Sequence, residues 1–182
     1  MATVEVRPLD PRDDRSGFLS GDPDLDRFFH KYAGQNQFRH HVGTTYVAVT
    51  GGMIAGFATV SAASVHVDDI SKSLRRRLPQ YPLPVLRLAR LAVDRRMQQQ
   101  GVGQQLLRTV LLLAREMAHR VGCTGVLVDA KPSAVEFYRG YGFEELELLE
   151  GQLGDRPAPV PMFLPLGSIP DPMRPEEGSS PM

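Results

Sequence analysis

A glycine-containing loop between an apolar strand and a long amphipathic helix constrains the fold of this chain more than any other segment. The strand is predicted over Val85–Val93, and the loop ends with Gly101 and Gly103. Apolar residues then recur at the spacing of one helix face, which predicts a helix over Gly103–Val121 with Gly122 as its C-terminal stop. The members of that face are Leu106, Leu107, Val110, Leu113, Ala114, Met117, Ala118 and Val121.

The other elements are predicted from similar local patterns. Asp22-Pro23 marks a helix start, because an acidic N-cap and a proline in the first turn suit the unpaired N–H groups there. Gly51-Gly52 is predicted as a two-residue hairpin turn. The expected strands are residues 3–8, 44–50, 53–64, 85–93, 125–130, 143–149 and 160–166, with a further helix over residues 133–141. This order predicts an α/β (α+β) fold, a mixed sheet with helices on both faces.

Length and composition limit the domain organisation and the location. The 182 residues suffice for one domain, expected over residues 1–166, and the Pro-, Gly-, Ser- and acid-rich residues 167–182 are expected to be a disordered tail. The single cysteine, Cys123, excludes an internal disulfide and a cysteine-ligand metal site. No apolar run is long enough to cross a bilayer, and the N-terminus lacks the pattern of a signal peptide. We therefore expect a cytoplasmic protein with no membrane contact and no metal.

The charge of the chain is unevenly distributed. The formal net charge is zero, yet residues 72–120 contain eleven Lys and Arg against two acids, and residues 144–182 contain eight acids against two arginines. A basic middle segment is typical of a protein that binds an anionic ligand or polymer there, and solvated helix faces give the same pattern. The charge alone leaves both interpretations open.

The loop before the long helix has the features of a phosphate site. N–H groups in the first turn of a helix lack intrahelical partners and lie at the positive end of the helix dipole, which suits a pyrophosphate. Gly101 and Gly103 let the backbone approach phosphate oxygens without an intervening Cβ. Glycines before a helix also occur in purely structural turns. A Walker A loop is excluded because no Gly-Lys-Ser/Thr follows, and the dinucleotide-binding Gly-x-Gly-x-x-Gly pattern is absent.

Two segments together resemble the GNAT superfamily of N-acetyltransferases. Gln98-x-x-Gly101-x-Gly103, which follows Leu91-Ala92-Val93, is similar to the pyrophosphate motif of that family. Residues 134–144, AVEFYRGYGFE, are similar to its helix and strand beside the coenzyme thiol. The resemblance implies that acetyl-CoA is the cosubstrate, and it implies the binding residues Leu91, Ala92, Val93, Gln98, Gln99, Gln100, Gly101, Val102, Gly103, Gln104, Phe137 and Tyr138.

This resemblance also implies a fold and a mechanism. The fold is a mostly antiparallel sheet of six to seven strands, whose two central parallel strands splay apart so that the pantetheine arm pairs with the backbone of Leu91 and Val93. Tyr138 is implied as the general acid that protonates the departing thiolate, after direct attack by the amine. Direct attack needs no nucleophile from the protein, so Cys123 is expected to be a small buried residue. A domain that binds coenzyme A without catalysis is the non-enzymatic alternative, and the presence of Tyr138 argues against it.

Within this superfamily the chain resembles the acetyltransferase toxins of type II toxin–antitoxin systems, over roughly residues 3–166. The similar segments are RLARLAVD at residues 87–94, GDPDLDRFF at 21–29, VDA at 128–130 and MFLPL at 162–166. The resemblance implies acetylation of the amino group of aminoacyl-tRNA, a block of translation, a homodimer and a ribbon–helix–helix antitoxin. The neutral overall charge departs from the basic character that a tRNA ligand favours. An acetyltransferase for a small-molecule amine or a protein N-terminus is therefore the alternative.

Four arginines are candidates for contact with the acceptor. Arg90, just before the pantetheine strand, is interpreted as a phosphate or tRNA contact or, equally, as part of a structural ion pair. Arg75, Arg76 and Arg77 either follow a nucleic-acid backbone or form a solvated run. No general base is predicted, because the five histidines show no partner spacing. An α-amine, with a pKa of about 7.7–8.0, needs less help than a lysine amine at about 10.4, which favours an aminoacyl or N-terminal amine.

Overall fold

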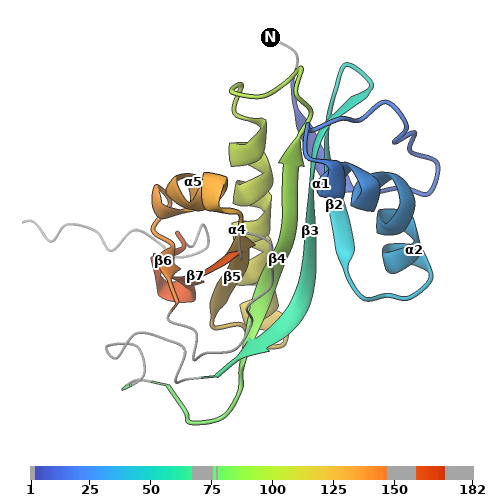
Figure 1. Cartoon of the computed structure of the whole chain (residues 1–182). Coiled ribbons are helices and arrows are strands. Elements are labelled where there is room, and N and C mark those ends of the chain that lie inside the picture. Colours follow the sequence, from blue (N-terminus) through green and yellow to red (C-terminus); the bar gives the residue numbers. More distant parts are fainter. Residues whose placement is uncertain (1–2, 67–75, 77, 147–158, 171–182) are drawn as a thin grey trace, which may run out of the picture.

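The computed structural model describes residues 3–66, 76, 78–146 and 159–170. In this part of the chain, seven strands form one sheet in the order β1-β2-β3-β4-β5-β7-β6 (Figure 1). The β4–β5 pair is parallel and the other pairs are antiparallel, which confirms the mixed, mostly antiparallel sheet. The strands are β1 (Glu5–Pro8), β2 (Thr44–Thr50), β3 (Met53–Val65), β4 (Leu83–Val93), β5 (Gly125–Ala130), β6 (Glu144–Glu145) and β7 (Val160–Pro165).

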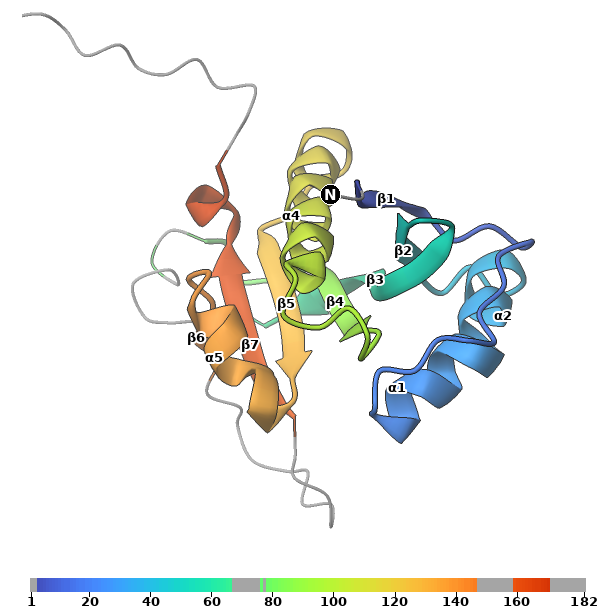
Figure 2. The same ribbon diagram turned by 90° about the horizontal axis from the view of Figure 1, so that it is seen from above.

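Helices cover both faces of the sheet, as predicted (Figure 2). Neighbouring residues of β3 point to opposite faces: Ala58 packs in the cluster of the long helix, whereas Phe57 packs in the cluster of the N-terminal helices, where it stacks on Phe29 at 4.3 Å between ring centroids. The helical elements are α1 (Pro23–Arg27), the π-helical turn η1 (Phe28–Tyr32), α2 (Ala33–Phe38), α4 (Val102–Arg120), the 3-10 turn η3 (Pro132–Ala134), α5 (Val135–Arg139) and the 3-10 turn η4 (Leu166–Ser168).

Three local features predicted from the sequence, a helix cap, a hairpin turn and a helix end, are present in the structure. The carboxylate of Asp22 caps α1 by accepting hydrogen bonds from two backbone N–H groups of the first turn, at 3.0 and 3.3 Å. Gly51 and Gly52 have φ angles of 55° and 75°, the left-handed values that a tight hairpin turn requires. Gly122 has a φ of 103° and ends α4. Each of these signals depends on residues close in sequence.

Strands β4 and β5 separate after a short paired stretch. They pair only from Leu86 to Leu88 on β4 and from Val126 to Val128 on β5. On its other side, β4 has a bulge: Arg90 lies opposite Thr59 and Leu88 lies opposite the next residue of β3, so Ala89 is the extra residue. A bulge bends and twists its strand. Here it lies where β4 leaves β5, and residues 89–93 face a gap.

The C-terminal part of the domain differs from the prediction. The structured chain does not end at residue 166, because η4 continues it and Ile169 is buried against α4 with 3% exposure. The Ile169 carbonyl also accepts a hydrogen bond from Arg115 Nε at 3.1 Å. The predicted start of the tail at residue 167 is thus too early, and the remainder of the proposed tail, residues 171–182, lies outside the described residues. Strand β6 covers only part of the predicted strand 143–149, of which residues 147–149 also lie outside them.

No helix in the described part of the chain is long and apolar enough to span a membrane. Within the same residues, no group of three or more His, Cys, Asp or Glu side chains is placed to hold a metal ion. Cys123 is buried, and its Sγ donates a hydrogen bond to the Gly125 carbonyl at 3.2 Å. Its position is that of a small core residue, as expected.

Candidate active site

The gap between β4 and β5 holds a cavity of about 280 Å³. Residues 88–93 of β4 form one wall, and the end of β5, the η3 turn and Tyr138 form another. The segment that leads into α1 adds Ser20, Asp22 and Leu25. The two motifs of the sequence and the N-terminal segment therefore meet around one site.

The backbone of Leu91 and Val93 faces this gap. The Asp94 N–H donates to the Ala55 carbonyl of β3 at 2.8 Å, and successive peptide groups of a strand alternate in direction, so the peptide groups of Leu91 and Val93 point away from β3. The side chain of Ala92 is buried on the α1 face of the sheet, so this residue offers the cavity only its backbone. The exposed peptide edge matches the backbone groups that were predicted to pair with a pantetheine arm.

The start of α4 offers backbone donors to an anion. Gly101 is the N-cap with a φ of 81°, and Gln99 also adopts a left-handed φ of 62°. The first hydrogen bond of the helix runs from the Gln105 N–H to the Gly101 carbonyl at 3.1 Å. The N–H groups of residues 102–104 precede this bond and have no intrahelical acceptor. This geometry fits the pyrophosphate site predicted from the glycines.

Gly103 lies where the two sequence motifs contact each other in the fold. A Cβ built on it would lie 3.6 Å from the side chain of Val93, 3.8 Å from that of Phe137 and 3.9 Å from that of Leu91. The first turn of α4 therefore packs against both the pantetheine edge of β4 and the helix that carries Tyr138. These distances are ordinary van der Waals contacts, so an alanine would fit here.

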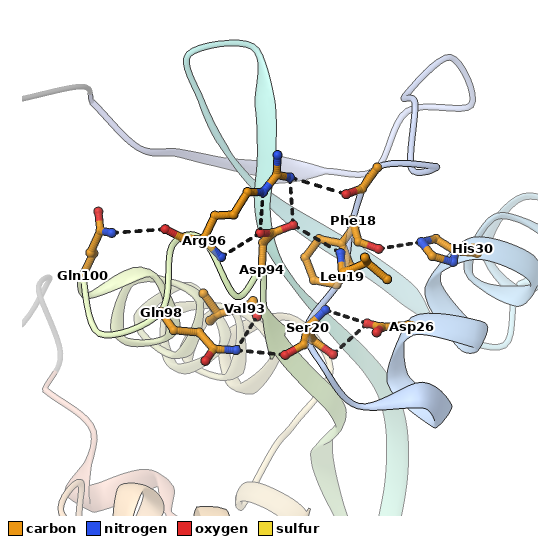
Figure 3. A network of polar contacts seen from close by, with 11 residues as sticks. Phe18, Leu19, Ser20, Asp26, His30, Val93, Asp94, Arg96, Gln98 and Gln100 are labelled. Atoms are coloured by element: carbon orange, nitrogen blue, oxygen red, sulfur yellow. Dashed lines mark hydrogen bonds and ion pairs between the residues drawn. The ribbon is translucent and has the colours of Figure 1, made fainter.

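Gln98 and Gln100 hold the loop through their side chains (Figure 3). The Nε2 of Gln98 donates to the carbonyls of Ser20 and Val93 at 3.0 and 3.1 Å. The Nε2 of Gln100 donates to the Arg96 carbonyl at 3.4 Å. Because these amide nitrogens already bind the protein, the loop offers its backbone N–H groups to a phosphate.

Asp94 fixes the end of β4 to the loop and to the N-terminal segment (Figure 3). Its carboxylate, 1% exposed, accepts hydrogen bonds from Arg96 Nε at 2.9 Å, from Arg96 Nη2 at 3.0 Å and from the Leu19 N–H at 3.2 Å. The hydrogen bond from the Arg96 side chain is the main cause that lowers the pKa of Asp94 to about 2, against the opposing effect of burial. The sequence placed Asp94 at the strand end but gave no sign of this clamp.

Ser20 and Asp26 continue the same network (Figure 3). The N–H and the Oγ of Ser20 donate to Asp26 Oδ1 at 2.8 and 2.7 Å. His30 Nε2 lies 2.7 Å from the Phe18 carbonyl. These contacts hold residues 18–20 between α1 and the loop, so the N-terminal segment forms a fixed side of the cavity.

Tyr138 lies at the cavity wall on a short helix. Its side chain is only 4% exposed, and its ring makes edge contacts with Phe137 and Phe143 at 5.1 and 5.4 Å between centroids. Burial raises the pKa of the hydroxyl above its ordinary value, so Tyr138 carries its proton at neutral pH. A protonated hydroxyl beside the gap is what a general acid requires.

A larger groove, about 930 Å³, adjoins the cavity. The residues that line both are Leu25, Ala89, Arg90, Asp129 and Lys131. The groove continues between the N-terminal helices and β3 and includes Phe28, Tyr32 and Val42. An acceptor in the groove can thus reach the cavity across these shared residues.

Arg90 differs from the other cations of the groove. Its guanidinium lies over the Phe28 ring, 3.8 Å from the centroid, and no described carboxylate forms an ion pair with it. The other cations, Arg27, Arg87 and Lys131, are paired with Asp24, Asp129 and Asp22. The structure therefore brings Arg90 to the junction of cavity and groove, over an aromatic ring and, within the described part of the chain, in no ion pair.

Of the three consecutive arginines predicted as acceptor contacts, only Arg76 lies within the described residues. Arg75 and Arg77 lie outside the described residues. Arg76 is exposed and lines neither the cavity nor the groove.

Comparison with known families identifies the class of this site. The model of the acetyltransferase (GNAT) domain matches residues 41–145, more than half of the chain. The chain belongs to the GNAT acetyltransferase family. The matched region contains the loop before α4 and the Tyr138 helix, and this GNAT enzyme is an acetyl-CoA-dependent N-acetyltransferase.

Relatives of this GNAT enzyme include named toxins. A tRNA-acetylating toxin of Mycobacterium tuberculosis is 34% identical over 139 residues, which cover 76% of this chain and 82% of that toxin. The crystal structure of a tyrosine-to-phenylalanine mutant of KacT has a TM-score of 0.79 at 25% identity, and the match covers 91% of this chain and 96% of KacT. AtaT complexed with acetyl-methionyl-tRNAfMet also has a TM-score of 0.79, at 24% identity, over 92% of this chain and 97% of AtaT. The AtaT likeness supports the fold.

Proposed function

We propose that this GNAT enzyme acetylates the amino group of aminoacyl-tRNA and blocks translation, as the toxin of a toxin–antitoxin pair. One observation carries the proposal: the cavity lined by Tyr138 shares five residues with an adjoining, larger groove, and Arg90, a cation with no ion pair among the described residues, lies at the junction. A relative that shares 34% identity over 76% of this chain is a tRNA-acetylating toxin, which supports the same substrate.

The residues for acetyl-CoA are proposed from the geometry of the gap. Acetyl-CoA supplies an activated acetyl thioester. The peptide edge of Leu91 and Val93, where, among the described residues, only the Val93 carbonyl accepts a side-chain hydrogen bond, from Gln98, suits the pantetheine arm. A backbone N–H there can polarise the thioester carbonyl as it gains charge. The N–H groups of residues 99–104 suit the pyrophosphate, because Gly101 and Gly103 present no Cβ to it.

Tyr138 is proposed as the general acid. When the acceptor nitrogen bonds to the carbonyl carbon and the C–S bond breaks, the sulfur leaves as a thiolate with a pKa of about 8.5. The buried Tyr138 hydroxyl carries a proton at neutral pH and donates it to this sulfur. The nitrogen loses one proton to solvent, and the Tyr138 phenolate takes one back from solvent, so atoms and charge balance over one turnover.

The neutral net charge of the chain is compatible with a tRNA substrate. Arg27, Arg87 and Lys131 are balanced by nearby carboxylates in the groove, whereas Arg90 is not paired with one among the described residues. A guanidinium that lies over a ring can still direct N–H donors outward, which suits a phosphate or a nucleotide base. Arg90 is therefore the proposed tRNA contact.

The partners and the location follow from the resemblance to type II toxins. We infer a homodimer in the cytoplasm that a ribbon–helix–helix antitoxin silences. A short gene for such a protein directly upstream would support this assignment.

A parallel acceptor assay tests the proposed function. Labelled acetyl-CoA is incubated with the enzyme and, separately, with charged tRNA, uncharged tRNA, polyamines and peptides. The expected result is label on charged tRNA only, released as an N-acetyl amino acid when the ester is hydrolysed. Faster labelling of a polyamine or a peptide would support a small-molecule or N-terminal acetyltransferase instead. Coenzyme binding without transfer to any acceptor would support a binding module.

A further inference from the structure

Asp22 holds an ammonium group at the mouth of the active-site cavity. One carboxylate oxygen, Oδ1, caps α1, and the other, Oδ2, binds the Nζ of Lys131. Both residues line the same cavity as Tyr138, although they are 109 positions apart in the sequence. One oxygen of this cavity carboxylate therefore caps a helix, and the other binds a primary amine.

Lys131 also reaches the place through which an acceptor must pass. It lies just after β5 and lines both the cavity and the adjoining groove. Its side chain is 45% exposed, so it can move into solvent without breaking a packed core. In its protonated form, the primary amine that the enzyme acetylates has the same charge and the same donors as the lysine Nζ.

We infer that Asp22 binds the amino group of the acceptor and that Lys131 occupies this place until the acceptor displaces it. The inference rests on the proposed function for the identity of the acceptor as aminoacyl-tRNA. It assigns the ion pair a role in substrate recognition, beyond joining α1 to β5.

The chemistry of the attack suits a carboxylate at this position. As the nitrogen bonds to the carbonyl carbon, it gains positive charge, which an adjacent carboxylate stabilises. Burial alone would raise the pKa of Asp22, but hydrogen bonds from Lys131 and from the first turn of α1 outweigh this effect and lower it. Asp22 therefore stays ionised and takes no proton from the nitrogen, which loses its proton to water. This role requires no general base from the protein.

A second carboxylate of the cavity provides a matched control. Asp129 lines both the cavity and the groove, and it is paired with Arg87 on β4. It carries the same charge as Asp22 but caps no helix and holds no primary amine in the structure. An effect of general negative charge would appear in both Asp22→Asn and Asp129→Asn, whereas specific amine binding would appear only in Asp22→Asn.

The test compares binding of charged tRNA with that of its deaminated form, hydroxyacyl-tRNA, in the presence of coenzyme A at pH 6.5. At this pH an α-amine is largely protonated, and the two ligands differ only in the amine. Wild type is expected to prefer aminoacyl-tRNA by about tenfold, as for a charged hydrogen bond. Asp22→Asn should remove the preference and leave the helix capped, because asparagine caps as well as aspartate. Lys131→Met should increase the preference, and Asp129→Asn should leave it unchanged.

Two results would overturn the inference. One is an Asp22→Asn variant that keeps the wild-type preference. The other is equal loss of the preference in Asp22→Asn and Lys131→Met, which is what a purely structural ion pair predicts, since either change breaks it. The proposed function fails separately, if wild type does not acetylate charged tRNA at all.

Discussion

At the scale of single residues, the site is assembled by contacts that connect distant parts of the sequence. Asp94 binds Arg96 two positions away, but it also binds the backbone of Leu19, 75 positions away. Gln98 reaches the Ser20 carbonyl over a similar separation. The sequence identified Gln98 and Tyr138 by their motifs. It did not identify the clamp or the Asp22–Lys131 pair, because such contacts depend on the folded sheet and leave no local pattern.

The Asp94 clamp should make stability depend on acid pH. The pKa of Asp94 is about 2 in the folded protein against an ordinary value of 3.8, which corresponds to about 2 kcal/mol of stability. A depressed carboxylate pKa stabilises the fold fully above the unfolded value, and this contribution is lost as the pH falls through about 2. Asp94→Asn should therefore lower the free energy of unfolding at pH 7, and the difference from wild type should shrink towards pH 2. Urea unfolding at a series of pH values measures this, with the exposed Glu5→Gln as control. A difference that stays constant with pH would contradict the prediction.

Arg90 should contribute to tRNA binding without affecting the coenzyme. Arg90→Ala is expected to weaken binding of charged tRNA and to reduce the salt slope by about one, as for the loss of one phosphate contact. Arg90→Lys should have an intermediate affinity for charged tRNA, because lysine keeps the charge but not the guanidinium that lies over Phe28. Binding isotherms at several salt concentrations measure the slope. The control Arg95→Ala removes an exposed arginine outside both cavities. An unchanged slope in Arg90→Ala would exclude the contact.

At the scale of elements, local physics predicted most of the fold. The apolar stripe of α4, the Asp22 cap and the Gly51-Gly52 turn all depend on residues close in sequence, and each was confirmed except at one position. Val121, predicted as the last member of the stripe, is the C-cap residue of α4 and is 79% exposed, because the helix ends at Arg120 before this side chain can reach the core. The bulge at Ala89 was not predictable, because it exists only in the register between β3 and β4. The separation of β4 from β5 was implied by the family resemblance and not by periodicity. Ile169 was assigned to the tail because the residues from Gly167 onward are rich in proline, glycine, serine and acids, although it packs on α4.

The start of α4 can be tested by charge at Gly103. Gly103→Glu should weaken acetyl-CoA binding by more than about tenfold, because it places a carboxylate against the pyrophosphate at the helix N-terminus. Gly103→Ala is the matched control, since its Cβ would meet only ordinary contacts at 3.6–3.9 Å. Calorimetry measures both affinities, and thermal unfolding confirms that the variants are folded. Wild-type affinity in a folded Gly103→Glu variant would exclude this loop as the pyrophosphate site.

At the scale of the whole molecule, the proposed site has two parts, one beside the start of α4 and one beside the N-terminal helices. The loop before α4 is the proposed coenzyme side, and the groove beside the N-terminal helices is the proposed acceptor side. The zero net charge of the chain gives no indication of cations in the groove. Most of these cations form ion pairs with nearby carboxylates. A direct transfer across the gap between β4 and β5 leaves a thiolate that must be protonated there, and Tyr138, which lines the cavity, is the proposed donor.

The most direct test is single-turnover acetyl transfer to charged tRNA by wild type and by Tyr138→Phe, at saturating acetyl-CoA. This change removes one hydroxyl and almost no volume, so the edge contacts of the ring should persist. The predicted result is a rate lower by about 10²–10⁴ with unchanged coenzyme affinity. Tyr141→Phe, a neighbouring tyrosine that does not line the cavity, should keep the wild-type rate. A Tyr138→Phe variant that retains most of the rate would contradict the assignment of Tyr138 as the acid.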